Sequence, residues 1–69
     1  MTQKELCYME DAVGHENNII KICTETINFL EDENLISFME QEKEKHVNMK
    51  NKLMEMLEVK SNEWSTING

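Results

Sequence analysis

Residues 30–35, LEDENL, separate two long stretches in which apolar residues recur every three or four positions. Asp32 is a favourable helix N-cap, and Glu33 would lie in the first turn of the next helix, where a carboxylate interacts favourably with the helix dipole. The spacing on either side predicts one helix over about residues 3–31 and a second over about residues 33–60. Because the connection is short, the two helices are expected to be antiparallel neighbours, an αα-hairpin.

The stretch before this break has the periodicity of an amphipathic helix. Thr2 and Glu5 have the spacing of a capping box, which would begin the helix. Apolar residues or a thiol then recur in steps of three and four. The residues expected in the seam of the bundle on this side are Leu6, Met9, Val13, Ile20, Cys23, Ile27 and Leu30.

The stretch after the break continues the same spacing to about residue 60. Two polar residues, Glu42 and His46, interrupt its otherwise apolar row. The residues expected in the seam on this side are Leu35, Met39, Met49, Leu53 and Met56.

The hairpin, residues 1–60, is expected to form a small domain, followed by a polar tail over residues 61–69 that contains Trp64. A chain of 69 residues buries only about 60% of its unfolded surface. Each helix also carries a second apolar row that a single partner helix cannot cover. An isologous second copy is the simplest cover, so we expect an all-α fold in which the antiparallel hairpin dimerises into a four-helix bundle.

The two cysteines are too far apart to bridge each other. Cys7 and Cys23 are sixteen residues apart on the first expected helix, which is roughly 24 Å along its axis. Bridged cysteines have Cα atoms within about 7 Å. Reduced thiols, and therefore a cytoplasmic place of synthesis, are expected.

Composition argues against several classes of partner. The net charge is −7, and all seven cationic residues are lysines. Nucleic acids and anionic membranes both require a basic surface, so neither is expected as a partner. No apolar stretch is long enough to span a bilayer, and the first residues do not resemble a secretory signal. Without a phosphate loop, catalytic triad or CxxC motif, the chain is expected to be non-catalytic.

Three polar residues are expected to meet in the middle of the hairpin. Folding the chain about residues 32–33 places Glu16 about one turn from His46, and His46 one turn from Glu42. We favour a hydrogen-bonded cluster that fixes the register of the core, over a solvated gap or a divalent-metal site. Di-metal bundles place a Glu three residues before the ligand His, and Lys43 stands there instead.

The chain resembles the short spore coat proteins of the coat F type found in endospore-forming bacteria. The opening pattern T-x-K-E-L-x-Y-x-x-D is carried by Thr2, Lys4, Glu5, Leu6, Tyr8 and Asp11. The later pattern L-x-D-x-x-L with KH is carried by Leu30, Asp32, Leu35, Lys45 and His46. The resemblance covers nearly the whole helical part. It implies a ferritin-like bundle, a place in the spore coat and contacts with other coat proteins.

The resemblance also bears on metal binding. Glu16 and His46 match positions at which ferritin-like relatives keep metal ligands, whereas Lys43 replaces the Glu of that motif. The leading expectation is therefore a structural or assembly protein of sporulation that acts through helix–helix contacts, without catalysis or cofactor. Two alternatives stay open. One is a minimal ferritin-like di-metal carboxylate protein with Glu16, Glu42 and His46 as ligands, and the other is a small regulatory hairpin of sporulation.

Overall fold

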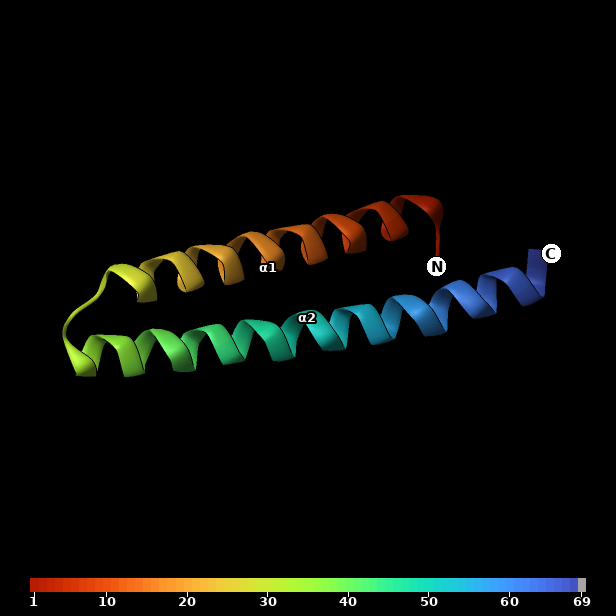
Figure 1. The fold of residues 1–69 in the computed structure, drawn as a ribbon. Coiled ribbons are helices and arrows are strands. Elements are labelled where there is room, and N and C mark those ends of the chain that lie inside the picture. The colour runs from red at the N-terminus through yellow and green to blue at the C-terminus, as the bar shows by residue number, and fades with distance from the viewer. Residues whose placement is uncertain (69) are drawn as a thin grey trace.

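The computed structural model consists of two antiparallel helices joined by a short turn (Figure 1). Helix α1 spans Gln3–Phe29 and helix α2 spans Glu33–Asn68. The structure describes the backbone of residues 1–68 and the side chains of residues 1–58. The predicted all-α hairpin is confirmed.

Helix α1 begins and ends where local hydrogen bonds satisfy its free backbone groups. The backbone N–H of Thr2 donates to Glu5 Oε1 at 2.9 Å, and the N–H of Glu5 donates to Thr2 Oγ1 at 3.1 Å. This reciprocal pair confirms the capping box. At the other end Leu30 has an extended backbone, and its N–H donates to the carbonyls of Thr26 and Ile27. The helix therefore stops within two residues of its predicted end.

Asp32 begins helix α2. Its carboxylate Oδ1 accepts hydrogen bonds from the backbone N–H groups of Asn34 at 2.8 Å and Leu35 at 3.1 Å. These are two of the N–H groups that have no partner within the helix itself. Only three residues lie between the helices, so α2 turns back directly along α1.

The predicted end of the second helix near residue 60 is wrong, because α2 continues to Asn68. The segment 61–68 loses the apolar periodicity but contains neither proline nor glycine, the residues that most readily break a helix. Loss of periodicity indicates that a segment has no continuous apolar side to pack against a neighbour. It does not indicate where the helical backbone ends. The side chain of Trp64 lies outside the described residues.

The core between the two helices is thin. Among the side chains of residues 1–58, Cys23 alone is buried, at 5% exposure. The other predicted seam residues of α1 are half-buried, as are Met39 and Leu53 of α2. The half-buried residues on α1 are Leu6, Met9, Val13, Ile20, Ile27 and Leu30.

On α2 the side that faces α1 differs from the predicted one. Leu35, Met49 and Met56 were expected in the seam, yet each remains about half exposed. The half-buried residues of α2 are Ile36, Met39, Glu42, Lys43, His46, Val47, Lys50, Leu53 and Leu57. Lysine can occupy such positions because its aliphatic stem packs against apolar neighbours while its ammonium reaches water. The α2 seam is therefore more polar than the sequence pattern indicated.

The hairpin is a narrow rod. Its Cα atoms span 53 × 15 × 12 Å. The N-terminus and the end of α2 lie at one end of the rod, and the turn lies at the other (Figure 1). Within the described residues, no helix has an apolar stretch long enough to cross a membrane.

Candidate functional site

A hydrogen bond between Glu16 and His46 joins the two helices near the middle of the hairpin. Glu16 Oε2 lies 2.5 Å from Nδ1 of His46. Packing against the opposite helix leaves the Glu16 side chain 14% exposed and the His46 side chain 31% exposed. The bond links residues thirty positions apart, so it fixes the relative height of α1 and α2. The predicted proximity of these two residues is confirmed.

Glu42 does not join this pair. Its Oε1 lies 3.1 Å from Nζ of Lys45, one turn further along the same helix. The Lys45 side chain is 72% exposed, so this ion pair is largely solvated and contributes little to stability. The predicted three-residue cluster is wrong in this respect, because a nearby ammonium competes successfully for the Glu42 carboxylate.

The donor set among the side chains of residues 1–58 does not fit a resident metal ion. Glu16 and His46 supply one carboxylate and one imidazole, already hydrogen-bonded to each other. Among the described side chains, no three His, Cys, Asp or Glu residues are placed to hold a metal. Zinc sites take at least three protein ligands, and di-metal bundles take more. The Glu42 carboxylate, which would be the third ligand, is paired with a lysine.

The two cysteines are separate free thiols. Cys7 is exposed on α1, and Cys23 is buried against α2. The prediction that they do not bridge each other is confirmed. Cys23 lies in the seam as a small apolar side chain.

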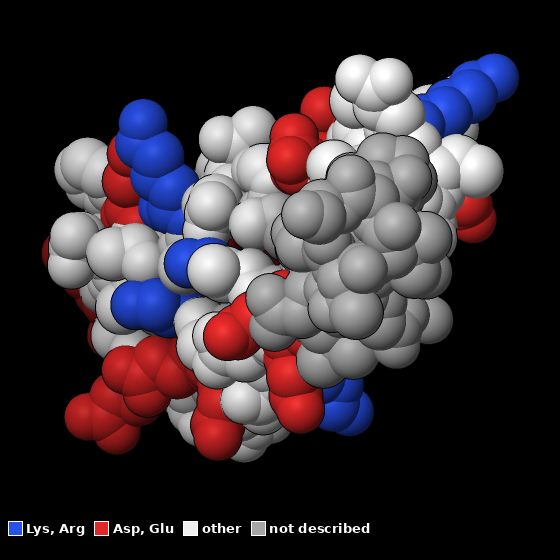
Figure 2. Space-filling view, turned by 90° about the vertical axis from the view of Figure 1, so that its right-hand side faces the viewer, with Lys and Arg blue, Asp and Glu red and all other residues white. Residues whose placement is uncertain are grey.

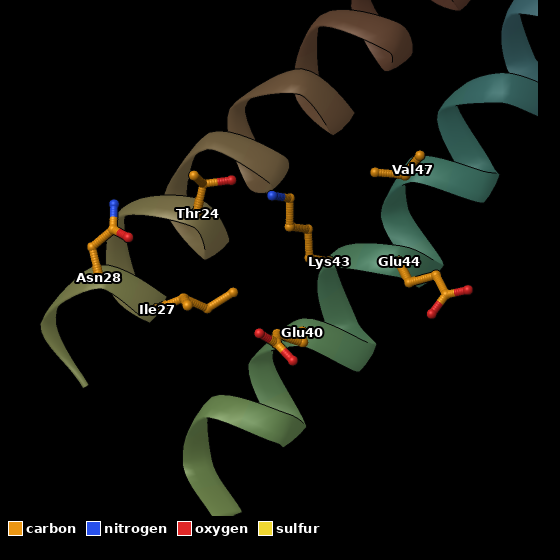
Figure 3. A pocket seen from close by; sticks show the side chains of 7 residues that line it. All are labelled: Thr24, Ile27, Asn28, Glu40, Lys43, Glu44 and Val47. Carbon is orange, nitrogen blue, oxygen red and sulfur yellow. The ribbon is translucent and has the colours of Figure 1, made fainter. Parts of the chain in front are cut away.

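One face of the hairpin carries a groove between the helices (Figure 3). Its volume is about 370 Å³. Lys43 and Val47 point toward α1, and Ile27 points toward α2, as Figure 3 shows. The other lining residues are Thr24, Asn28, Glu40 and Glu44.

Two rows of residues at seven-residue spacing define a second side of the hairpin. On α1 the row is Tyr8, His15, Ile22 and Phe29. On α2 it is Leu35, Glu42, Met49 and Met56. Seven residues are close to two helical turns, so each row lies along one side of its helix. Six of these eight residues are large and apolar, and all six are at least half exposed, with Phe29 reaching 86%.

The two rows lie on the same side of the hairpin. Tyr8 from the first row and Met56 from the second line one pocket, of about 420 Å³, at the end away from the turn. Met1, Glu5 and Met9 complete it. We call the side that carries both rows and this pocket the apolar face.

The apolar face includes three residues of α2 that the sequence analysis assigned wrongly. Leu35, Met49 and Met56 were assigned to the seam, because they satisfy steps of three and four as well as the true seam residues do. Their seven-residue spacing does not separate them from the seam, because Met39, His46 and Leu53 have the same spacing. It is the repeat of helices that pack against further helices in a supercoil.

Charged residues flank the apolar face: Lys4 Nζ lies 6.0 Å from the centre of the Tyr8 ring, and Glu5 lines the pocket. The two rows of this face contain one carboxylate, that of Glu42, which is paired with Lys45. Viewed along the helix axes, lysine and acidic side chains are spread over the visible surface of the molecule (Figure 2). The two rows themselves are suited to apolar contacts.

Comparison of the chain with protein-family models, with curated proteins and with solved structures gives no match.

Proposed function

We propose that this protein is a non-catalytic structural or assembly protein that acts through helix–helix contacts, first of all with a second copy of itself. The observation that carries the proposal is the contrast between the seam and the apolar face. Among the described side chains Cys23 alone is buried, whereas six large apolar residues of the two heptad rows are at least half exposed.

The energetics of a small hairpin support self-association. A single small core rarely supplies more than about 3–5 kcal/mol without a disulfide, a metal or a partner subunit. Cys7 and Cys23 form no disulfide with each other, and the donor set does not fit a metal. A partner subunit is the remaining means of stabilisation. Contiguous exposed apolar patches of several hundred Å² are typical of interaction sites.

The proposal includes a role in sporulation. The support for it is the resemblance to coat F-type spore coat proteins in the opening and turn regions, where Thr2, Glu5 and Asp32 cap the helices. On this proposal the chain is made in the cytoplasm, forms a ferritin-like four-helix bundle as a dimer, and joins other proteins in the spore coat.

Solution mass tests the self-association. Light scattering at micromolar concentration should report about twice the chain mass of 8.2 kDa. A compact monomer with a cooperative unfolding transition would contradict the proposal, because it would show that the hairpin needs no partner.

Fractionation of spores tests the biological setting. On this proposal, the source organism forms endospores, and an antibody against the chain should detect it in detergent extracts of their coat. Recovery of the chain with one defined signalling protein, and with no coat component, would instead favour a regulatory hairpin. A rise in melting temperature of several degrees with Mn²⁺, Fe²⁺ or Zn²⁺, lost in Glu16→Ala, would favour the di-metal alternative.

A further inference from the structure

We propose that a second copy of the chain covers the apolar face with its turn at the opposite end, so that Phe38 of each copy closes the pocket beside Tyr8 and Met56 of the other. The twofold axis then passes at the height of the Glu16–His46 bond. This inference rests on the proposed self-association and adds the face and the orientation of the interface.

The size of the apolar face fits a second copy. Its rows extend from Phe29 to Met56, roughly 35 Å along the rod at 1.5 Å per residue. Two adjacent helices are about 20 Å wide with their side chains, so the face covers about 700 Å². Stable complexes of standard size bury about 800 Å² on each partner. A second hairpin is therefore a partner of suitable size, and it presents the same face in return.

Phe38 and the pocket lie at equal distances from the Glu16–His46 bond, on opposite sides of it along the rod. Phe38 is on the same side of α2 as Leu35 and Glu42, and its ring is 57% exposed. It lies eight residues before His46, and Tyr8 lies eight residues before Glu16. Because the helices are antiparallel, Phe38 is about 12 Å from the central bond toward the turn, and Tyr8 about 12 Å away from the turn.

A twofold axis at the central bond exchanges these two heights. Phe38 of one copy then lies over Met56 and the pocket of the other, and the reverse contact forms at the opposite end. The pocket of about 420 Å³ is open in the single hairpin, and it has room for an aromatic ring. Both ends of the interface would be filled by the same pair of contacts.

The charges permit this contact. The two rows contribute Glu42 as their one carboxylate, and Lys45 already balances it. The centre of the interface brings the two Glu16–His46 bonds to the same height, where each polar pair is already internally hydrogen-bonded. The carboxylates of Glu42 and Glu16 therefore need no new partners when the faces meet.

The alternative dimer has both turns at the same end. Phe38 would then face the helix α1 of the partner at its own height, near Ile22, and the pocket would stay open. The two arrangements predict different neighbours for Phe38. Engineered disulfides separate them.

The test uses cysteine pairs in a Cys7→Ser, Cys23→Ala background. Phe38→Cys with Met56→Cys should form a covalent dimer under mild oxidation with diamide, whereas Phe38→Cys with Ile22→Cys should not. Residues 38 and 56 are about 27 Å apart within one chain, so they cannot bridge internally. A covalent dimer from the second pair but not from the first would overturn the orientation. Failure of both pairs in a background that is dimeric would overturn the face as well.

Two methionines supply a matched control in the native chain. Met54 and Met56 are similarly exposed, at 48% and 55%, but they lie two residues apart and so point to nearly opposite sides of α2. Met56→Ser should raise the dimer dissociation constant at least tenfold in analytical ultracentrifugation, and Met54→Ser less than twofold. Equal effects would overturn the face assignment. A native chain that is monomeric throughout would refute the proposed self-association itself.

Discussion

At the residue scale, the Glu16–His46 bond is the main polar contact between the helices. Replacing His46 with Leu leaves the Glu16 carboxylate, at 14% exposure, without its partner in a largely apolar seam. A stranded polar group of this kind costs about 1–3 kcal/mol. The free energy of unfolding from urea titration, at one fixed protein concentration, should fall by that amount.

The double variant Glu16→Leu with His46→Leu shows whether the stability is lost because the hydrogen bond is gone or because one buried polar group is left without a partner. Removing both polar groups leaves nothing unpaired, so its stability should lie closer to that of the wild type than either single variant does. Glu42→Gln provides the control. Its ion pair with the largely exposed Lys45 is solvated, and the change should be within about 1 kcal/mol. A double variant less stable than both singles would contradict this reasoning.

Gly14 provides a second prediction at this scale. It lies inside α1, and a Cβ atom built at this position meets nothing within 4 Å. Within the hairpin, therefore, no neighbouring helix approaches closely enough to require glycine at this position. Gly14→Ala should stabilise the protein by about 0.5–1 kcal/mol, from the greater helix propensity of alanine, and thermal unfolding should show it. Destabilisation would mean that a partner approaches the backbone there.

Pairing of individual residues could be predicted from the sequence only in part. The contact of Glu16 with His46 follows from folding the chain about its turn, because both fall in the seam at the same height. The position of Glu42 did not follow, because Lys45 competes for its carboxylate. Competition between a partner on the same helix and one across the seam depends on side-chain geometry that periodicity does not contain.

At the element scale, the start of α2 depends on one side chain. Asp32 accepts two backbone hydrogen bonds, so Asp32→Ala should cost about 0.5–2 kcal/mol. Asp32→Asn should retain most of the stability, because its side-chain oxygen can accept the same bonds. Glu31→Ala, beside it in the turn, is the control and should change little. Equal losses at positions 31 and 32 in urea unfolding would show that turn charge, rather than capping, is responsible.

The elements differ in how far the sequence predicts them. Capping residues act through bonds to neighbours along the chain, so Thr2 and Asp32 could be identified from local spacing. The side of α2 that faces α1 could not, because the rows containing Met39 and Met49 have equally good helical spacing. Tertiary packing chooses between them, and it places Met49 outside.

At the scale of the whole molecule, a narrow rod of 53 × 15 × 12 Å has too little interior to bury its own apolar side chains. The same residues that make α1 and α2 amphipathic therefore give the hairpin an unburied face. The free energy of unfolding therefore depends on association, because a partner that covers the apolar face also stabilises the folded helices. Exposure of Phe29, Phe38 and Met56 is thus the basis of the proposed assembly.

Net charge opposes this association, and salt should reveal it. Each copy carries a net charge of −7, so two copies repel each other through water, while the contact that joins them is apolar. Raising the ionic strength from 0.01 M to 0.15 M shortens the Debye length from about 30 Å to about 8 Å. The dimer dissociation constant in analytical ultracentrifugation should therefore fall several-fold over this range. Lys45→Gln, which removes one positive charge from each copy, should steepen the dependence. Weaker association at higher salt would instead mean that ion pairs between the copies, rather than apolar contacts, hold the interface together.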